Sequence, residues 1–371
     1  MNKIQGRRFV LQVSSLALAL AACVPAFAHD EASLRSGKVF TSTNGTGGNE
    51  LLVYAPARSG ELTLVTRVAT QGQGTGAGLG SQGAVTLSGD GRHVFVVNAA
   101  SNTVSTFALR GANAVLTSVV DSGGLQPISV TENDGMVVVL NAGGAGNVAG
   151  FRNLNGELRL MQGSARGLSA AGGTGPAQVG FGADGDVLVV TEKATSRITS
   201  YNVRRDGTIG QPIITASSGS TPFGFAFDRR DHLIVSEAVA SAASSYRFDE
   251  HGPAAAHLLS ASVPNTQAAA CWVVVTPNGR YAYTANAGTS SLSSYRIARA
   301  GTIELANAVA GSTGVNAGAT DMAVSPDGGQ LFAVAPRSLQ IVSFKVGYDG
   351  SLTTLGVGTG LPTGSAGLAA N

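Results

Sequence analysis

Residues 270–309 read ACWVVVTPNGRYAYTANAGTSSLSSYRIARAGTIELANAV, and this stretch decides the fold. It holds four short apolar runs, and the first two flank the turn sequence Pro277-Asn278-Gly279. Proline presets φ for a turn, and Asn-Gly accepts positive φ at little steric cost. The third run alternates apolar and polar residues, which is the period of a half-buried strand. The stretch therefore predicts four short antiparallel strands joined by tight turns.

The same unit recurs seven times from residue 37 onward. An aromatic residue marks the equivalent strand of each copy, at intervals of 44 to 53 residues: Tyr54, Phe107, Phe151, Tyr201, Tyr246, Tyr295 and Phe344. Four-stranded repeats of about 40–50 residues are typical of β-propeller blades. Beyond the N-terminal segment, no apolar stretch has the period and caps of a helix. The sequence predicts an all-β fold, a seven-bladed β-propeller of four-stranded antiparallel blades.

The two ends of the repeat array complete one another. The first copy has strands expected at 38–43, 51–55 and 62–68 but lacks its innermost strand, and the chain ends with an unassigned strand at 366–370. If this last strand pairs beside 38–43, the N- and C-terminal strands close the ring and leave no open sheet edge between the first and last blades. We expect a single propeller domain over residues 29–371.

Residues 1–28 have the features of a signal peptide. A basic segment at 3–8 precedes an apolar stretch at 9–22 that is too short for a permanent membrane anchor. Two processing patterns fit. Ala-Phe-Ala at 26–28 matches ordinary cleavage after this motif, and Leu-Ala-Ala at 20–22 matches the residues before a lipidated Cys23, which would anchor the protein to a membrane. Both predict a periplasmic or secreted protein.

The composition excludes several classes of partner. Charged residues make up 12% of the chain, compared with about 25% in an average soluble protein. Part of the formal net charge of +2 comes from the leader, so the remaining domain has no basic field for nucleic acid or anionic lipid. No Cys/His cluster predicts a metal site, and no motif predicts a cofactor. We expect a monomer without a transmembrane segment.

Two further features are expected to be structural. Cys271 stands between Ala270 and Trp272 in an apolar run, which favours buried packing over a nucleophilic role. The glycine-rich stretch at 72–80 opens no helix, so it predicts a flexible loop between blades rather than a phosphate-binding motif.

Recurring motifs indicate a family. The fourth strands begin with phrases such as GELRL at 156–160 and GTIEL at 301–305, and other strands contribute SPDG at 325–328 and YAYTAN at 281–286. With these motifs, residues 37–371 resemble the seven-bladed lactonase family, which includes bacterial 6-phosphogluconolactonase and fungal carboxymuconate lactonizing enzymes. The resemblance implies a propeller with lactonase or cycloisomerase activity.

The resemblance also implies where a site would lie. In a propeller, the inter-blade linkers that lead into the first strands share one face with the loops between second and third strands. Members of the family resemble one another in carrying His and Arg where first strands begin, with a Glu nearby. Here the sequence runs GPAQ at 175–178 and TPFG at 221–224, and no histidine stands at such a position. The family's cations for a phosphorylated or carboxylated lactone are therefore replaced.

Polar residues close most of the second strands on this linker face: Asn44, Asn98, Asn141, Glu192, Glu237 and Asn286. Asparagines there fit turn caps that bond nearby backbone N–H groups, and Asn98, Asn141 and Asn286 are also candidate substrate-binding residues. Glutamate is a poor turn former, so Glu192 and Glu237 are the candidate catalytic residues. Two nearby carboxylates would raise one pKa and create a general base.

Four more residues belong to the expected cluster at the channel mouth. Lys193 and Arg197 share a loop with Glu192 and would orient an anionic ligand, although a solvated ion pair in the loop is an alternative explanation. Gln178 and Asp321 stand at the starts of first strands and complete the candidate substrate-binding set.

Two functions remain open. The first is an extracytoplasmic lactonase or cycloisomerase-like enzyme, acting on an unidentified lactone. The second is a non-catalytic periplasmic or secreted binding or scaffold propeller. In it, an apolar ring of Ile128, Phe223 and Trp272 would hold a small-molecule ligand or a partner protein at the channel face. The family resemblance favours the first, and the missing His and Arg favour the second.

Overall fold

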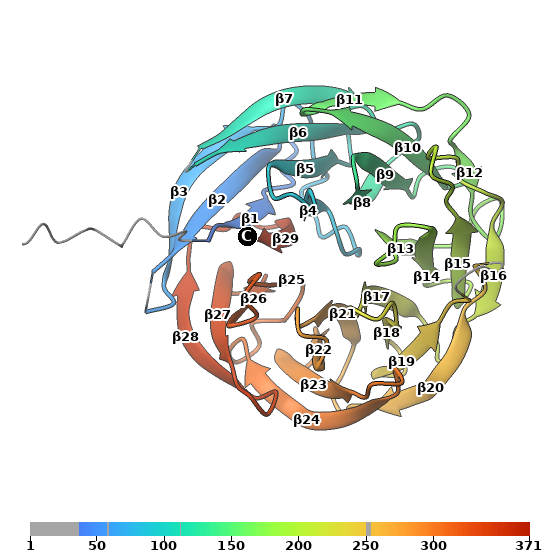
Figure 1. The fold of residues 1–371 in the computed structure, drawn as a ribbon. Coiled ribbons are helices and arrows are strands. Elements are labelled where there is room, and N and C mark those ends of the chain that lie inside the picture. Colours follow the sequence, from blue (N-terminus) through green and yellow to red (C-terminus); the bar gives the residue numbers. More distant parts are fainter. Residues whose placement is uncertain (1–36, 58, 112, 250–253) are drawn as a thin grey trace, which may run out of the picture. The chain divides into compact units, whose positions relative to one another are not determined.

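The computed structural model describes residues 37–57, 59–111, 113–249 and 254–371, and the expected leader at 1–28 lies outside this part of the chain. The described residues form a ring of seven blades around a central channel (Figure 1). Each blade is built on four antiparallel strands, and one blade carries an additional short strand, which confirms the predicted architecture. None of the described residues forms a helix long and apolar enough to cross a membrane.

Blades 2, 3 and 4 keep the chain order of their strands from the channel to the rim. Blade 3 carries one additional short strand, β12, which pairs with β10. The strands are β4 (Val85–Leu87), β5 (His93–Asn98), β6 (Thr103–Arg110), β7 (Asn113–Asp121), β8 (Pro127–Asn133), β9 (Met136–Asn141), β10 (Asn147–Leu154), β11 (Glu157–Leu160), β12 (Arg166–Gly167), β13 (Pro176–Phe181), β14 (Val187–Glu192), β15 (Arg197–Asn202) and β16 (Ile213–Ala216).

Blades 5, 6 and 7 repeat the same order without additions. Their strands are β17 (Pro222–Phe227), β18 (Leu233–Glu237), β19 (Ala242–Arg247), β20 (His257–Pro264), β21 (Ala270–Val275), β22 (Tyr281–Asn286), β23 (Ser291–Ile297), β24 (Ile303–Ser312), β25 (Met322–Val324), β26 (Gln330–Ala335), β27 (Gln340–Val346) and β28 (Leu352–Gly358).

Blade 1 contains both ends of the described chain. Its strands from the channel outward are β29 (Ala366–Ala370), β1 (Val39–Ser42), β2 (Glu50–Pro56) and β3 (Leu62–Ala69). Strands β29 and β1 pair antiparallel along their length, which confirms the predicted closure of the ring. The outer strands β28 and β3 also pair, in parallel, so blades 7 and 1 form one eight-stranded sheet.

The aromatic markers of the repeat form the centres of the core. All seven lie on third strands, are at most 1% exposed and belong to seven different hydrophobic clusters: Tyr54, Phe107, Phe151, Tyr201, Tyr246, Tyr295 and Phe344. Each such ring removes about 150–250 Å² from water. The sequence repeat therefore reproduces the same buried layer around the ring.

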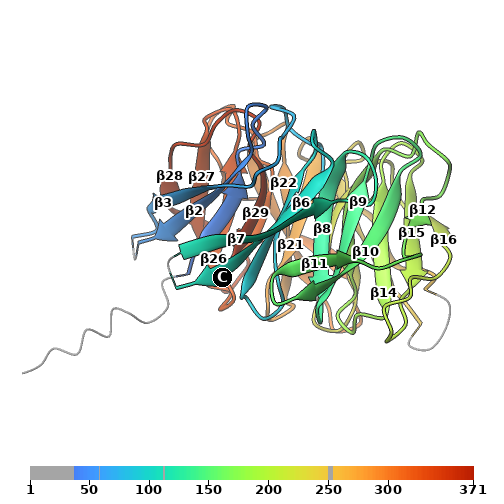
Figure 2. The same ribbon diagram turned by 90° about the horizontal axis from the view of Figure 1, so that it is seen from above.

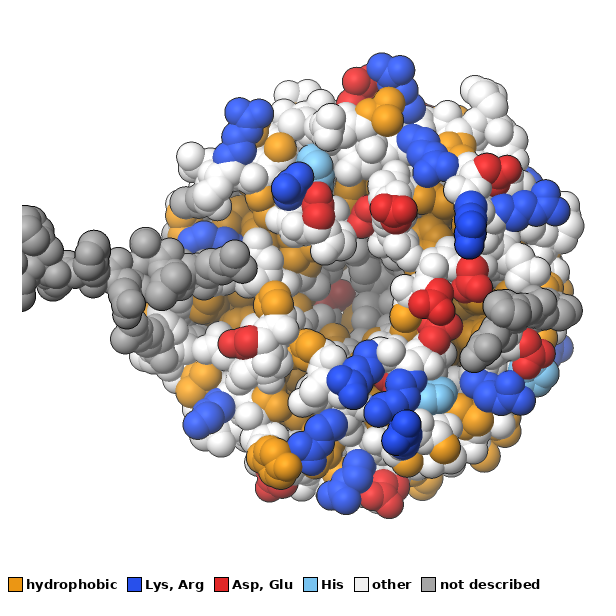
Figure 3. Space-filling view, in the orientation of Figure 1, with side chains coloured by type: hydrophobic (Ala, Val, Ile, Leu, Met, Phe, Trp, Pro, Cys, Tyr) orange, Lys and Arg blue, Asp and Glu red, His pale blue; other side chains and the backbone are white. Residues whose placement is uncertain are grey.

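The two faces of the ring carry different connections (Figure 2). The linker face holds the inter-blade linkers and the loops between second and third strands. The opposite face, here the turn face, holds the tight turns between first and second strands. The glycines of five of these turns have φ between 67° and 75°, as the sequence predicts: Gly91, Gly135, Gly185, Gly279 and Gly328. Arg and Asp side chains gather on the turn face around a central hollow (Figure 3).

Candidate functional site

The Glu192 carboxylate fastens an inter-blade linker to its blade. Glu192 ends β14 and is completely buried. Its Oε1 accepts hydrogen bonds from the Ser169 backbone N–H at 2.9 Å and from Thr199 Oγ1 at 2.6 Å. Its Oε2 accepts from the Ser169 hydroxyl and from Thr195 Oγ1 at 2.8 Å. Both oxygens are therefore occupied by donors from the protein.

Glu237 ends β18 in the next blade and has the same surroundings. It is completely buried, and its Oε1 accepts from the Gly219 backbone N–H, in the linker into blade 5, at 2.8 Å. Its Oε2 accepts from the Ser262 hydroxyl on β20. The two glutamates thus have separate sets of partners. The structure does not gather them with Gln178 and Asp321 into one cluster.

The asparagines at equivalent positions also hold linkers. Asn98 accepts from Thr70 Oγ1 at 2.8 Å, and Asn286 accepts from Asn265 Nδ2 at 2.8 Å. Asn141 donates to a linker carbonyl at 3.1 Å. We call Asn98, Asn141, Glu192, Glu237 and Asn286 the clamp residues. They bond the linker that enters their blade, rather than only their own turn as an Asx cap would.

The two cations of the expected cluster differ in surroundings. Lys193 Nζ donates to the Gly80 carbonyl at 2.5 Å and lies 5.0 Å from the centre of the Phe223 ring. Burial lowers the pKa of Lys193. Arg197 begins β15 and is exposed. In the described residues neither forms the ion pair with Glu192 that the sequence suggested as an alternative.

A segment of the linker between β3 and β4 crosses the channel on the side of the linker face. This plug loop, residues 79–83, reaches into the centre of the ring (Figure 1). The Ser81 carbonyl accepts from Trp272 Nε1 at 2.9 Å. The Gln82 side chain donates to the Val273 carbonyl at 2.7 Å and accepts from the Val273 N–H at 2.9 Å. The loop therefore joins blade 2 to blade 6 across the channel.

The glycines before the plug loop serve close packing. Gly74 N–H donates to the Gly45 carbonyl at 2.8 Å, and Gly76 N–H donates to the Asn44 carbonyl at 2.7 Å. A Cβ on Gly74 would lie 2.1 Å from the Asn44 carbonyl carbon. Residues 72–80 belong to the inter-blade linker that the sequence predicts, and at Gly74 the backbone approaches the Asn44 backbone too closely for a side chain.

Asp321 is the unusual acid of the linker face. It directly precedes β25 and is 5% exposed, and its Oδ1 has no hydrogen-bond partner in the described residues. Burial raises the pKa of Asp321 to about 7, although the Gly367 backbone and the Trp272 side chain beside it act in the opposite direction. A carboxyl with these properties can exchange a proton near neutral pH.

Two neighbours of this region have structural contacts. Gln178 Nε2 donates to the Phe225 carbonyl at 2.9 Å, and Gln178 Oε1 accepts from the Phe225 N–H at 2.7 Å. Gln178 thereby joins the first strands of blades 4 and 5. Cys271 is 8% exposed, and burial raises the pKa of its thiol to about 11. A thiol with that pKa is a poor nucleophile at neutral pH.

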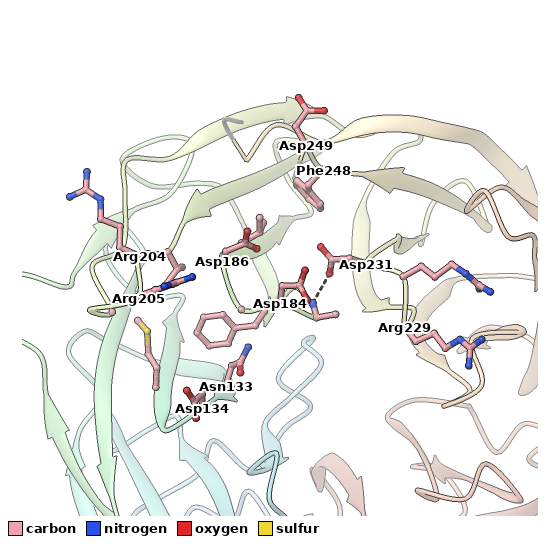
Figure 4. Close-up of a pocket in the computed structure, with 18 of the residues that line it drawn as sticks. Asn133, Asp134, Asp184, Asp186, Arg204, Arg205, Arg229, Asp231, Phe248 and Asp249 are labelled. Carbon is pink, nitrogen blue, oxygen red and sulfur yellow. Dashed lines mark hydrogen bonds between the residues drawn. The ribbon is translucent and has the colours of Figure 1, made fainter. Parts of the chain in front are cut away.

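A cavity of about 1260 Å³ opens on the turn face, between the turns of blades 3, 4 and 5. Asp184 and Asp231 lie side by side on neighbouring turns, while Arg229 points away (Figure 4). Burial and the carboxylates of Asp184, Asp186 and Asp228 raise the pKa of Asp231. Among the described residues, no group of three or more His, Cys, Asp or Glu side chains is arranged to hold a metal ion.

Comparison with known proteins supports the resemblance. Residues 254–366 match the family described as Lactonase, 7-bladed beta-propeller. The resemblance to this family is confirmed for these residues. No curated protein matches the sequence.

Solved structures show the same ring. A 6-phosphogluconolactonase candidate from Bacteroides fragilis has 17% identity and a TM-score of 0.68, and the match covers 91% of this chain and 98% of that one. The periplasmic gluconolactonase of Pseudomonas aeruginosa has 15% identity and a TM-score of 0.67, over 89% and 98%. A virginiamycin B lyase from Staphylococcus aureus has 14% identity and a TM-score of 0.54, over 73% and 82%. The chain has the fold of the seven-bladed lactonases.

The lactonase fold alone does not fix the chemistry, since the same ring carries a gluconolactonase and a lyase. Sequence reasoning missed two parts of the molecule. The sequence contains a signal for the turn-face cavity, because the charged motifs DGD at 184–186 and RRDH at 229–232 stand in equivalent turns of adjacent blades. The plug loop had none, because Gln82 and its partner Val273 are 191 residues apart.

Proposed function

We propose that the protein is an extracytoplasmic lactonase whose reactive group is Asp321 in the central channel. The observation that carries the proposal is the unpartnered Oδ1 of this buried carboxyl, together with its pKa of about 7. Leaving a buried polar atom without a partner costs about 1–3 kcal/mol. Proteins commonly retain such a cost where the group has a chemical task.

The proposed reaction is the addition of water to a lactone carbonyl. The Asp321 carboxylate takes a proton from water as the water oxygen bonds to the carbonyl carbon. The ring C–O bond then breaks, and the departing oxygen receives the proton back from Asp321. The Gly367 backbone beside Asp321 would hold the carboxylate in place during these steps. A base with a pKa of about 7 is half ionised at neutral pH, which suits both steps.

The neighbouring side chains favour an uncharged lactone. Phe223 and Trp272 form an aromatic pair with ring centres 4.9 Å apart. The starts of the first strands lack the His and Arg that the family resemblance leads us to expect, so a phosphorylated substrate would find no cationic partner there. The leader at 1–28 supports a periplasmic or secreted location, where sugar phosphates are scarce.

A lactone panel tests this proposal. The purified protein should release acid from uncharged lactones, measured by titration at constant pH, and should not act on 6-phosphogluconolactone. Asp321→Asn should lower turnover by about 100-fold or more, the usual scale for loss of a general base. The variant should remain folded, because Asn keeps the shape of the side chain. Full activity in Asp321→Asn would refute the assignment.

The turn-face cavity favours a second function, that of a non-catalytic binding propeller. Ligand pockets commonly enclose about 300–1,000 Å³, so this cavity can hold a small molecule. Its wall combines the rings of Phe181 and Phe248 with charged side chains. A ligand that raises the melting temperature of the wild type but not of Phe181→Ala, in a protein inactive towards every lactone, would support this function over the first.

A further inference from the structure

The plug loop lies against a group of buried side chains. Phe223, Cys271 and Trp272 are 6–8% exposed, and Asp321 is 5% exposed. Gly80 and Ser81 of the plug loop bond Lys193 and Trp272 directly. In this conformation the loop packs against these residues at the linker-face side of the channel, and Asp321 is buried.

One donor is shared between the plug loop and the acid. The indole of Trp272 has a single N–H, and it donates to the Ser81 carbonyl at 2.9 Å. The same indole lies beside the Asp321 carboxyl, whose Oδ1 has no partner. Since one N–H cannot fully serve both acceptors, a bond to the plug loop leaves Oδ1 of the carboxyl without a partner.

We propose that the plug loop is a movable cover over Asp321, and that its Ser81 carbonyl competes with the Asp321 carboxyl for the Trp272 N–H. With the cover closed, the indole bonds the loop. With the cover withdrawn, the indole donates to the carboxylate, and a hydrogen bond to an ion is the stronger kind. The cover controls access to the site of the proposed function, but its existence can be tested without any substrate.

The backbone around the loop is suited to such a change. Gly76, Gly80 and Gly83 have φ of 71°, 60° and 83°, a region that glycine occupies without strain. Gln82 is the residue of the loop whose side chain makes two hydrogen bonds, both to the Val273 backbone. Loss of these two bonds would favour the open cover.

The molecule contains a matched control for this anchor. Gln178 makes the same pair of side-chain bonds to the backbone of Phe225, at 2.9 and 2.7 Å. Gln82 stands in the plug loop, whereas Gln178 stands on β13. The two substitutions Gln82→Ala and Gln178→Ala therefore remove equivalent bonds, but only the first releases the cover.

Cys271 reports the opening. It is the only cysteine after Cys23 of the leader, so a small uncharged thiol reagent applied to the mature, leader-free protein modifies one site. Two lost hydrogen bonds of about 0.5–1.5 kcal/mol each should raise the modification rate of Gln82→Ala about tenfold over wild type. Gln178→Ala should stay within about twofold. Equal rates in Gln82→Ala and wild type, or equal increases in both variants, would overturn the proposal.

Hydrogen exchange of backbone amides in the wild type provides a second test, which needs no substitution. The Val273 and Phe225 N–H groups each donate to a glutamine side-chain oxygen, at 2.9 and 2.7 Å. If the cover opens, Val273 should exchange at least about tenfold faster than Phe225, because local opening frees it without unfolding the blade. Equal exchange rates, both set by global unfolding, would contradict a movable cover even if the Gln82→Ala variant does not fold.

The pH dependence of modification separates the cover from the catalytic proposal. The ionised carboxylate of Asp321 accepts a stronger hydrogen bond from the Trp272 N–H than the protonated carboxyl does. The cover should therefore open more at pH 8 than at pH 6. Lys193 and Cys271 are the other titratable groups near the same space, and the reactivity of the thiol itself rises with pH. Wild-type modification should therefore rise more steeply than that of Asp321→Asn. If the modification rates of the two proteins rise equally with pH, Asp321 does not control the cover, whatever the lactone assays show.

Discussion

The linker face and the turn face both carry carboxylates, but their surroundings differ. The protein surrounds Glu192 on the linker face with hydrogen-bond donors, whereas the carboxylates of the turn face line an open cavity. On the linker face Glu192 accepts four hydrogen bonds and is completely buried. On the turn face Asp184, Asp186 and Asp231 line an open cavity, and burial together with the two neighbouring carboxylates raises the pKa of Asp231. The role of a carboxylate therefore depends less on its position in the repeat than on the hydrogen-bond donors around it.

Asp321 breaks this pattern, because it lies at the linker face with one carboxyl oxygen, Oδ1, that has no hydrogen-bond partner in the described residues. Among the acids named for that face, it alone combines burial, an unpartnered oxygen and a pKa near 7. The comparison of faces thus separates clamps, which stabilise the ring, from one carboxyl that is free to react.

The largest effect should come from opening the ring on which both faces depend. Deleting residues 361–371 removes β29 and leaves β1 as an open edge. We expect the melting temperature to fall by about 10 °C or more, measured by circular dichroism, since several kcal/mol of buried contacts are lost. An unchanged melting curve would show that the closure contributes little.

A smaller but still large effect should distinguish the two kinds of carboxylate. Glu192→Ala leaves its donors on Ser169, Thr195 and Thr199 without acceptors, and should lower the free energy of unfolding by about 4 kcal/mol. The matched change Asp184→Ala on the turn face should stay within about 0.5 kcal/mol. Urea denaturation measures both. Similar losses in the two variants would contradict the distinction between clamp and free carboxylate.

The raised pKa of Asp321 predicts a pH-dependent stability. Folded Asp321 keeps its proton up to about pH 7, while its ordinary pKa is 3.8. The folded state binds the extra proton between these values, so stability falls as pH rises through this window and levels off above it. Relative to Asp321→Asn, the wild type should lose about 3 kcal/mol between pH 4.5 and 8. Parallel curves for the two proteins would mean that the carboxyl titrates normally.

The fold was largely predictable, because each blade repeats the same local signals. Asn278-Gly279 and its equivalents specify turns, and the aromatic markers specify the buried layer. The strand at 366–370 could be paired in advance since the first copy lacked a partner. The site was less predictable. Glu192 resembles a catalytic acid in the sequence, but its role depends on Ser169, which reaches it only through the inter-blade linker.

The contribution of the plug loop was hidden for a similar reason. Gln82 looks like an ordinary loop residue, and its partner Val273 lies in a strand four blades further along the chain. Hydrogen bonds between a side chain and a distant backbone leave no periodic pattern. Asp321 was recognised as a candidate, but its lack of a hydrogen-bond partner appears only in three dimensions.

The smallest effect should come from the acidic turns. Asp231→Asn keeps an oxygen to accept the hydrogen bond from the Ala183 N–H and removes repulsion from Asp184 and Asp186. We expect a gain of up to about 0.5 kcal/mol at pH 8, which disappears at low pH where the carboxylates are protonated. A loss of stability at pH 8 would indicate that Asp231 is held by contacts of the kind found at the clamps.

The most direct measurement is the titration of Asp321 itself. The side-chain carboxyl carbon can be followed by nuclear magnetic resonance from pH 3 to 9, with Asp321→Asn identifying its signal. The midpoint should lie at about 7. A midpoint near the ordinary value of 3.8 would show that the carboxyl is satisfied like the clamps, and would contradict its assignment as the reactive group.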